Sequence, residues 1–374
     1  MPPGKSMTQN HPLSSDHRAS NPQGAWLTIV SGERRGLAAA AARAGLTVLA
    51  GLYRAGLFFS NRRFRVPGAI RRASRPVVSV GNLTVGGTGK TPLVAHLAVL
   101  VAEMGGRPVI LSRGYAAPAG RPNEEALELE RLCPDVPHLQ NPDRRKALED
   151  WVAQNPCDVA ILDDGFQHRG LARDLDIVLI DALRPFGFGH VLPRGLLREP
   201  LSALRRADLV IITRADLVDA EALAALKQDL AGRARTGAPV LVAGHQPRGL
   251  LVADGSRRHA DWLRDREVAA ACGIGNPEAF RLTLEQAGAA VRLFEIFPDH
   301  HAYTSADLDH VLRLAEAAGL KTLVTTGKDW VKWQPLLAGS PRRPPIEVAA
   351  LEVAMKFLEG EQALRREIGA LLHR

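Results

Sequence analysis

Cysteine is scarce in this sequence: only Cys133, Cys157 and Cys272 occur among its 374 residues. Because they are odd in number and widely spaced, they form neither a disulfide framework nor a CxxC metal site. Such a chain suits a reducing cytoplasm, and we expect the thiols to be small buried side chains. The sequence also shows no internal repeat, and no GxGxxG segment opens a helix, which disfavours a dinucleotide-binding fold.

The composition is that of a globular protein with an excess of positive charge. Hydrophobic residues make up 46% and charged residues 24%, enough to bury two domains or one large α/β unit. Lys and Arg number 48 against 40 Asp and Glu, a formal charge of +8, which favours anionic partners such as phosphate groups or acidic lipid. No basic patch interleaved with aromatic residues is present, so a nucleic-acid partner is not expected.

The N-terminal region divides into a polar tail and an apolar segment. Residues 1–35 are polar and lack an apolar period, which predicts a disordered tail. The segment 36–60 is apolar apart from Arg43 and Arg54. A membrane-spanning helix needs about 20 apolar residues, but each central Arg costs roughly 2.5–3.5 kcal/mol.

A membrane-associated helix that lies in the interface is the preferred interpretation of 36–60. Arg43 and Arg54 are eleven positions apart and share one helix face, which leaves the remaining surface apolar. The alternative is an Ala-rich helix packed on the protein's own core. A basic run follows that would suit acidic headgroups, or else forms a solvated linker. Its members are Arg62, Arg63, Arg65, Arg71, Arg72 and Arg75.

Beyond residue 75, short apolar runs alternate with helical stretches, which predicts an α/β fold with a doubly wound, mainly parallel sheet. The expected strands are 76–80, 108–112, 158–162, 176–180, 208–213, 239–243, 268–273, 291–297, 322–326 and 346–351. A boundary near 248 divides a core domain at 61–247 from a smaller α/β domain at 248–374. The apolar spacing of 356–373 predicts a C-terminal helix.

The segment 76–105 has the strand, glycine-rich loop and helix that a phosphate-binding loop requires. Three glycines allow backbone N–H groups to converge on phosphate oxygens at the positive end of the helix. Lys90 would contact the β- and γ-phosphates of ATP, and the Thr91 hydroxyl would bind Mg²⁺. Thr84 stands where the usual pattern has glycine. The expected ATP-binding residues are Thr84, Val85, Gly86, Gly87, Thr88, Gly89, Lys90 and Thr91.

Two acidic residues end the apolar run 158–162. Asp163 and Asp164 would complete the nucleotide site, one as a ligand of Mg²⁺ and the other orienting a donor or a water. A strand end followed by an ordinary Asp-Gly turn is the alternative. The loop at 84–91 favours the magnesium site.

Six motifs together resemble the tetraacyldisaccharide 4′-kinase family, also called lipid A 4′-kinases. The motifs, over roughly residues 36–330, are VGNLTVGGTGKTP (80–92), SRGY (112–115), DDGFQH (163–168), LLREP (196–200), GIGNP (273–277) and FPDHH (297–301). The resemblance implies a P-loop kinase that transfers the γ-phosphoryl group of ATP to the 4′-hydroxyl of a tetraacylated glucosamine disaccharide 1-phosphate. It also implies a location at the cytoplasmic face of the bacterial inner membrane, on its lipid surface, and we expect a monomer.

The resemblance also implies catalytic and substrate-binding residues. The family's proton acceptor is an Asp of a GDEP-like segment paired with the His of FPDH. Here His300 matches, but Glu124 stands where the family has Asp, and its extra methylene moves the carboxylate by roughly an ångström or more. The segment 116–122 before it is short for the family. Arg144, Arg198 and Glu199 occupy positions expected near the phosphates and the disaccharide.

A GTPase or metallochaperone-like NTPase is the alternative function. Thr213-Arg214-Ala215-Asp216 follows an apolar strand and is similar to the TKxD element that reads guanine. Its Lys is missing, however, and LLREP and FPDHH are not expected in such a protein.

Overall fold

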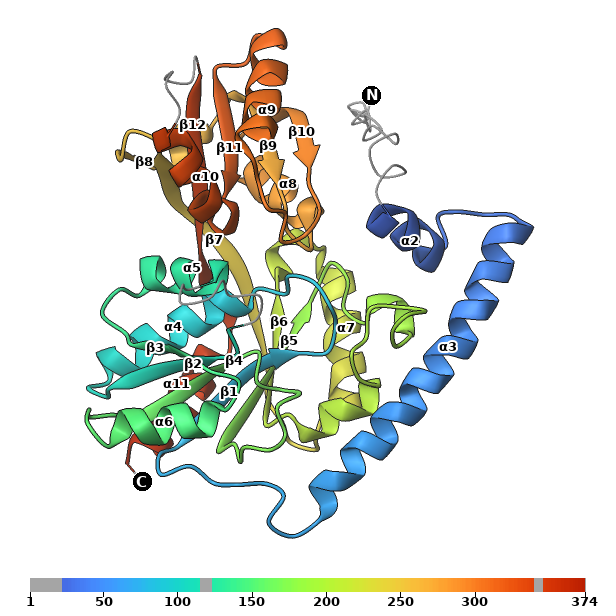
Figure 1. The fold of residues 1–374 in the computed structure, drawn as a ribbon, viewed down its shortest axis with the longest axis vertical. Helices are drawn as coiled ribbons and strands as arrows, with labels where there is room; N and C mark the ends of the chain where they lie inside the picture. Colours follow the sequence, from blue (N-terminus) through green and yellow to red (C-terminus); the bar gives the residue numbers. More distant parts are fainter. Residues whose placement is uncertain (1–21, 115–122, 340–345, 374) are drawn as a thin grey trace, which may run out of the picture.

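The described part of the protein consists of two lobes that share one twelve-stranded sheet (Figure 1). The computed structural model describes residues 22–114, 123–339 and 346–373. The strand order is β10-β9-β11-β12-β7-β6-β5-β1-β4-β2-β3, with β8 paired to β7. The predictions for residues 1–21 and 115–122 lie outside the described residues.

The first lobe contains a parallel sheet whose central strands are completely buried. These strands are β1 (Val77–Asn82), β2 (Pro108–Ser112), β4 (Val159–Asp163), β5 (Leu175–Asp181) and β6 (Leu209–Thr213). Their apolar, β-branched residues fit a sheet covered on both faces. The prediction of a doubly wound parallel sheet is therefore confirmed.

Helices cover both faces of this sheet and a short edge strand extends it. The elements are β3 (His138–Gln140), α4 (Lys90–Glu103), α5 (Glu124–Leu132), α6 (Arg144–Val152) and α7 (Ala220–Arg233). Short 3-10 turns connect them: η2 (Gly187–Gly189), η3 (Leu201–Arg206) and η4 (Ala215–Leu217). The edge strand β3 was not predicted, because three half-buried residues carry no hydrophobic pattern.

The second lobe is a smaller α/β unit with its own core. Its elements are β8 (Arg257–His259), η5 (Ala260–Leu263), β9 (Glu267–Cys272), α8 (Pro277–Gln286), β10 (Ala290–Ile296), α9 (Ser305–Ala317), β11 (Thr322–Thr326) and α10 (Gly327–Gly339). Buried apolar residues gather on both faces of its strands. The prediction of a second α/β unit after residue 248 agrees with this lobe.

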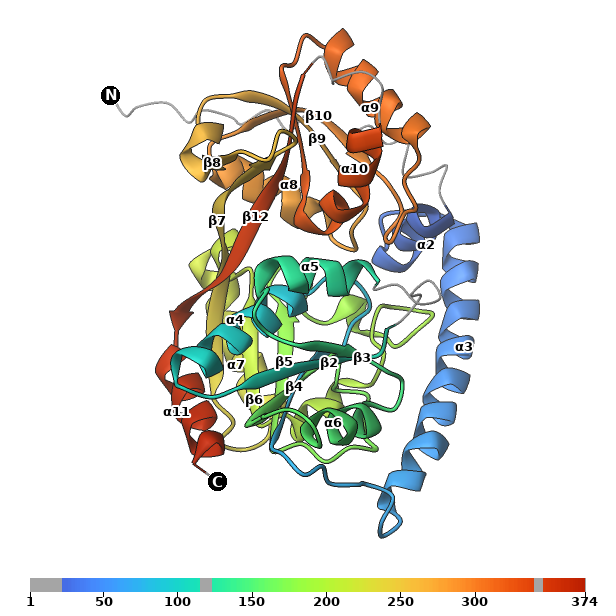
Figure 2. The same cartoon turned by 60° about the vertical axis from the view of Figure 1, so that its left-hand side comes forward.

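Two long antiparallel strands run from one lobe into the other (Figure 2). They are β7 (Val240–Val252) and β12 (Glu347–Glu359), so the predicted boundary at 248 falls inside a strand rather than in a linker. After β12, α11 (Glu361–Leu372) packs back on the first lobe through Leu364 and Ile368. The C-terminal end of the predicted second domain therefore belongs to the first lobe, and the helix predicted from 356 begins only at 361.

The N-terminal helices lie at one side of the molecule (Figure 1). Helix α2 (Pro22–Ser31) falls in the segment predicted as a disordered tail, so that prediction is wrong for 22–31. Its indole Trp26 Nε1 donates to the carbonyl oxygen of Pro193 at 2.9 Å, a contact that the sequence cannot show. Helix α3 (Leu37–Arg62) and the turn η1 (Arg63–Arg65) follow.

Helix α3 packs on the first lobe by one narrow face only. Ala50 is buried there, and the Tyr53 hydroxyl donates to the carbonyl oxygen of Arg198 at 3.0 Å. Arg43 donates to the carbonyl oxygens of Ile29 and Arg34, which ties α3 to the preceding segment. Within the described residues, no helix is long and apolar enough to cross a membrane.

Candidate functional site

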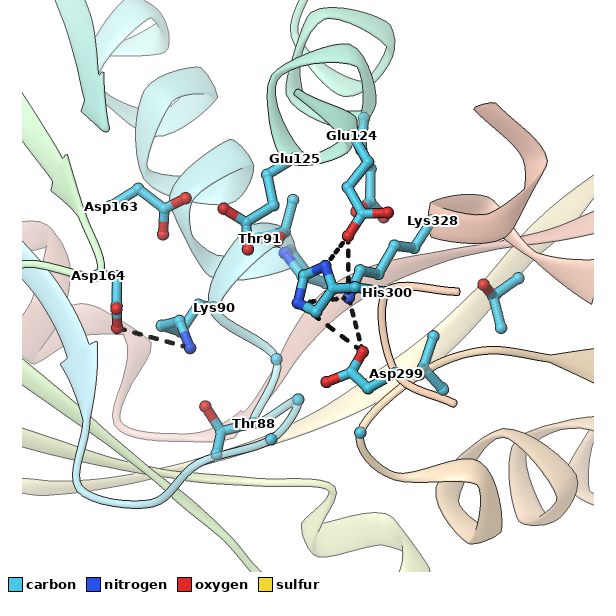
Figure 3. Close-up of a pocket in the computed structure, with 18 of the residues that line it drawn as sticks. Thr88, Lys90, Thr91, Glu124, Glu125, Asp163, Asp164, Asp299, His300 and Lys328 are labelled. Carbon is cyan, nitrogen blue, oxygen red and sulfur yellow. Dashed lines mark hydrogen bonds and ion pairs between the residues drawn. The ribbon is translucent and has the colours of Figure 1, made fainter. Parts of the chain in front are cut away.

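One cavity of about 1300 Å³ lies between the lobes at the carboxyl ends of the first lobe's strands. All eight residues of the predicted phosphate-binding loop line it, from Thr84 to Thr91. In open α/β sheets this edge is where ligands bind. The cavity therefore joins the loop to side chains from both lobes (Figure 3).

The loop follows β1 and ends where α4 begins. Gly86 and Gly89 have φ angles of 105° and 87°, which only glycine adopts without strain. Thr213 Oγ1 donates to the carbonyl oxygen of Thr88 at 2.9 Å, and Arg214 donates to that of Gly87 at 2.8 Å. These bonds satisfy two loop carbonyls and fix the backbone of the loop. The loop is thereby shaped to present its N–H groups to an anion.

Lys90 is the first residue of α4 and points toward the end of the adjacent strand β4. Its Nζ donates to Asn82 Oδ1 at 3.3 Å and lies 3.7 Å from Asp164 Oδ1. The side chain is only 18% exposed. A cation held this way can exchange its neighbours for the oxygens of a triphosphate.

The two predicted acids lie beside this lysine and differ in their charge state. Asp163 ends β4 and is buried, which raises the pKa of its carboxyl to about 7, with Glu125 adding to the effect. Burial opposes ionisation of Asp164 as well, but Lys90 and Arg198 outweigh it and hold its pKa well below the usual range. Arg198 donates to both carboxylate oxygens of Asp164 at 2.8 Å. Asp164 is thus held as an anion, whereas Asp163 would ionise more readily with a cation bound beside it.

The residues present fit a nucleotide-bound magnesium ion rather than a self-contained metal site. Asp163 Oδ1 is buried and has no hydrogen-bond partner among the residues that the structure describes, so it is available as a ligand. No group of three or more His, Cys, Asp or Glu side chains that could hold a metal occurs within residues 22–114, 123–339 and 346–373. Mg²⁺ commonly takes one or two protein carboxylates and completes its shell with phosphate oxygens and water. Asp163, Asp164 and the Thr91 hydroxyl would hold it here.

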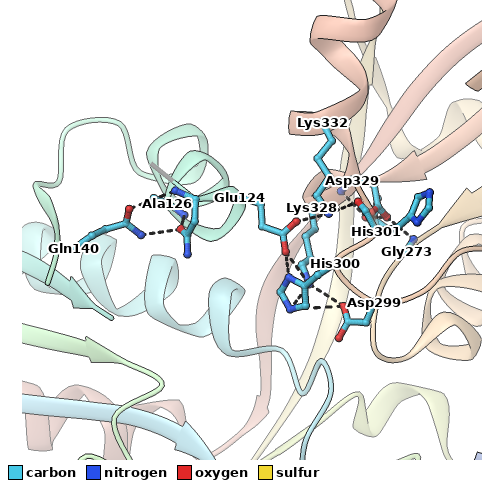
Figure 4. A network of polar contacts seen from close by, with 12 residues as sticks. Glu124, Ala126, Gln140, Gly273, Asp299, His300, His301, Lys328, Asp329 and Lys332 are labelled. Atoms are coloured by element: carbon cyan, nitrogen blue, oxygen red, sulfur yellow. Dashed lines mark hydrogen bonds and ion pairs between the residues drawn. The ribbon is translucent and has the colours of Figure 1, made fainter. Parts of the chain in front are cut away.

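The predicted pair Glu124 and His300 meets across the gap between the lobes (Figure 4). Glu124 begins α5 of the first lobe, and His300 lies in the turn before α9 of the second. His300 Nδ1 is hydrogen-bonded to Glu124 Oε1. Burial, together with the nearby Lys328 and Lys332, lowers the pKa of His300 to about 4. The imidazole is therefore neutral near pH 7 and able to accept a proton.

The three predicted substrate residues do not share one environment. Arg144 and Arg198 line the cavity. Arg144 is buried and the pKa of its guanidinium is lowered by burial, while Asp163 and Asp164 favour its charged form. Glu199 does not line the cavity, because its buried carboxylate accepts hydrogen bonds from Arg206 at 2.9 and 3.0 Å. The structure thus places Glu199 in support of the LLREP turn and not in the cavity.

Several cavity residues escaped the sequence interpretation. Lys328 and Lys332 lie on α10 beside Glu124, and His245 lines the cavity behind Gly89. Single lysines and histidines look like solvated or structural residues in a sequence, so only the spacing of four between the lysines offered a signal.

The element similar to TKxD is used structurally. Arg214 forms an ion pair with Asp181 in addition to its bond to the loop, and both side chains are buried. Asp216 is packed against Gly244 and does not line the cavity. A carboxylate that reads guanine must face the ligand, so the GTPase alternative finds no support in this geometry.

Comparisons with known proteins agree with this site. The family model of tetraacyldisaccharide-1-P 4′-kinase matches residues 42–373. A tetraacyldisaccharide 4′-kinase of Anaeromyxobacter dehalogenans (strain 2CP-C) is 44% identical over 323 residues, which are 81% of this chain and 82% of that protein. The enzyme of the same name from Geobacter sulfurreducens is 38% identical over 360 residues, covering 89% of this chain and 98% of that protein.

A solved structure adds the fold to this agreement. The crystal structure of LpxK from Aquifex aeolicus in complex with ATP is 31% identical in sequence, with a TM-score of 0.66. The match covers 88% of this chain and 99% of that one. The fold and the matched residues lead to one conclusion: the chain belongs to the tetraacyldisaccharide 4′-kinase family.

Proposed function

We propose that this protein is an ATP-dependent kinase that phosphorylates the 4′-hydroxyl of a tetraacylated disaccharide 1-phosphate, a step of lipid A biosynthesis. The observation that carries the proposal is the meeting, in one cavity, of the phosphate-binding loop with the Glu124–His300 pair from opposite lobes. A kinase needs both halves, since one holds the donor and the other activates the acceptor. Family membership supports the same reaction.

The first lobe would bind ATP. Loop N–H groups and Lys90 would offset the charge of the β- and γ-phosphates, and Asp163, Asp164 and Thr91 would hold Mg²⁺. Mg²⁺, when bound, would supply positive charge that offsets the negative charge developing during transfer. Arg198 keeps Asp164 ionised and aimed at this region, and Arg144 is placed to grip either a phosphoryl oxygen or the acceptor's own phosphate.

The acceptor hydroxyl would lose its proton to the Glu124–His300 pair. Its oxygen then forms a bond to the γ-phosphorus while the bond from that phosphorus to the bridging oxygen of ADP breaks. Glu124 and His300 share a hydrogen bond through Nδ1, which leaves His300 Nε2 beside Lys328 Nζ at 3.5 Å. General bases of this kind contribute about 10²–10⁴ in rate.

The outer face of α3 would place the enzyme on a lipid surface, at the cytoplasmic face of the inner membrane. Leu37, Val48, Leu52, Phe58 and Phe59 are between 53% and 92% exposed. Monomeric proteins rarely expose such a continuous apolar face, and a helix of this kind binds in the membrane interface. Tyr53 and Leu57 on the inner face reach the cavity wall, which connects the membrane-facing helix with the site where the sugar is needed.

The kinase activity is tested directly by product formation. Purified protein, radiolabelled ATP, Mg²⁺ and the tetraacylated disaccharide 1-phosphate are mixed in detergent micelles, and lipid products are separated by thin-layer chromatography. We expect label in a lipid with one additional phosphate for the native protein and none for Glu124→Gln. Label released only as inorganic phosphate would contradict a kinase and indicate an NTPase.

Membrane association is tested separately by flotation with vesicles that contain anionic lipid. We expect the double variant Leu52→Asp, Phe59→Asp to show a vesicle-bound fraction lower by about tenfold or more. Each change removes apolar area that the lipid would cover, and each adds a charge. Leu358→Asp is the matched control, because Leu358 is 46% exposed but lies on β12. Equal flotation of all three proteins would refute the role of α3.

A further inference from the structure

Two lysines of α10 face the catalytic pair. Lys328 and Lys332 are one helical turn apart, so their side chains emerge from the same face of the helix. They are only 19% and 18% exposed. Lysines are rarely buried to this extent unless they are paired, so their partners explain their position.

Each lysine contacts both sides of the gap between the lobes (Figure 4). Lys328 Nζ lies 3.6 Å from Glu124 Oε1 and donates to Asp299 Oδ1 at 3.0 Å. Lys332 Nζ is ion-paired with the other Glu124 oxygen and donates to the carbonyl oxygen of His301 at 3.1 Å. One carboxylate from the first lobe is therefore held by two ammonium groups that also hold the turn around His300.

The turn around His300 needs such support. His300 has a φ of 61°, a conformation that residues other than glycine rarely adopt. Strained conformations of this kind persist only where surrounding contacts fix them, and they gather at active sites. The contacts of Lys328 and Lys332 with Asp299 and His301 bracket the strained residue on both sides.

The helix that carries the lysines is itself fixed. Asp329 is fully buried and accepts hydrogen bonds from Gly273 N at 3.0 Å and Thr326 Oγ1 at 2.7 Å. At the start of α10, Gly327 approaches Arg131 of α5 so closely that a Cβ would lie 2.6 Å from the guanidinium. Helix α10 therefore presents its lysines from a rigid base that abuts α5.

We propose that Lys328 and Lys332 are positioning residues for phosphoryl transfer, which hold Glu124 on His300 across the lobe gap so that the proton-accepting pair is assembled only in the closed cleft. The proposal rests on the proposed roles of Glu124 and His300. It assigns the lysines no contact with ATP or with the acceptor hydroxyl. They differ in this from Lys90, whose place is at the nucleotide phosphates.

The lysines also influence the charge of the base. Near His300, each additional cation disfavours a second positive charge, so the ring stays neutral and able to accept a proton. The charged groups that face the ring are Glu124 of α5, Lys90 of α4, Lys328 and Lys332 of α10, and the adjacent Asp299. Removal of Lys328 takes away one of these cations and leaves the negative charge of Asp299 without its lysine partner. Both changes favour the protonated ring of His300.

The test compares steady-state kinetics of Lys328→Met and Lys332→Met with the native protein, varying ATP and the lipid acceptor separately. We expect kcat to fall about tenfold or more with both KM values within about twofold, because the lost contacts position the base and not the substrates. The acid limb of the kcat profile of Lys328→Met should move to higher pH. Lys332→Arg keeps the charge and the donors, so it should recover most of kcat.

Lys321→Met is the matched control, since Lys321 is an exposed lysine of the same lobe. Melting temperature and ATP affinity of each variant are measured alongside, and Lys332→Arg remains informative if a methionine variant fails to fold. Unchanged kcat in both methionine variants overturns the proposal. An acceptor KM that rises with kcat unchanged also overturns it, because the lysines would then bind the acceptor's phosphate.

The proposal fails separately from the function on which it rests. If Glu124→Gln retains full activity, the proposed proton acceptor is wrong. If Glu124→Gln is inactive while the lysine variants turn over normally with an unshifted pH profile, only the positioning role is wrong.

Discussion

Gly275 offers a perturbation whose size follows from the structure. It lies in the GIGNP segment between β9 and α8 of the second lobe, against the phosphate-binding loop of the first. A Cβ on Gly275 would lie 2.7 Å from both Gly86 Cα and Gly87 N. These are backbone atoms that cannot rotate away. The change Gly275→Ala must therefore push the two lobes apart.

The separation of the lobes that this change requires is small, but its expected effect on the rate of phosphoryl transfer is large. Ordinary contact begins at 3.4 Å, so the loop and the second lobe must separate by about 0.7 Å. Misplacement of reacting groups by 1 Å can cost about a hundredfold, and we expect kcat/KM for ATP to fall roughly ten- to a hundredfold, about 1.4–2.7 kcal/mol. The strain falls between lobes rather than in either core, so the free energy of unfolding should change by less than about 1 kcal/mol.

The assay is initial-rate phosphoryl transfer at varied ATP, with urea unfolding as the measure of stability. Gly232→Ala is the control, because Gly232 is on the exposed side of α7 and nothing lies within 4 Å of its added methyl. Native kcat/KM in Gly275→Ala would refute the close approach of the lobes. A large loss of stability with the same kinetics would equally contradict the reasoning.

Three further predictions follow from the site. Lys90→Ala should lower kcat by about a thousandfold or more, because the loop cation offsets charge in the transition state, and near-normal rates in the transfer assay would refute the nucleotide site. His300→Ala should lower kcat by about 10²–10⁴ with little change in ATP affinity measured by calorimetry; weakened ATP binding instead would argue against a base. Burial, aided by Arg214, lowers the pKa of His245 to about 3. As pH falls, the unfolded chain is therefore protonated at this histidine before the folded chain, and the free energy of unfolding should fall below about pH 6.5 by up to about 1.4 kcal/mol per pH unit. Urea unfolding of His245→Asn should show a weaker dependence of this free energy on pH. An unchanged dependence would exclude His245 as the cause.

The strands and the glycine-rich loop could be predicted from the sequence because each depends on a pattern within a short stretch of consecutive residues. Ten apolar runs became strands, since a buried parallel sheet needs continuous apolar residues. The loop at 84–91 and the acids Asp163 and Asp164 come together because adjacent parallel strands end at the same edge. Glu124 and His300 were paired by resemblance, since no local pattern joins residues 176 positions apart.

The features that escaped prediction depend on contacts between distant segments. Nothing in the run 356–359 distinguishes the end of strand β12 from the start of a helix, and only its pairing with β7 decides. Helix α2 is stabilised by contacts near Pro193 and Arg194, far along the chain. Lys328 and Lys332 look like the solvated face of a helix until α5 is placed opposite them. Glu199 was assigned to the substrate by resemblance, and its ion pair with Arg206 becomes visible only in the folded chain.

We propose that the cleft holds a triphosphate on the glycine loop beside two acids that bind the same magnesium ion. Isothermal titration calorimetry with a nonhydrolysable ATP analogue, with and without Mg²⁺, tests it most directly in the native protein and in Asp163→Asn. We expect one nucleotide per chain, with affinity that rises on adding Mg²⁺ for the native protein and responds much less in the variant. Nucleotide binding that is indifferent to Mg²⁺ in the native protein, or absent altogether, would rule out a magnesium–nucleotide site in this cleft.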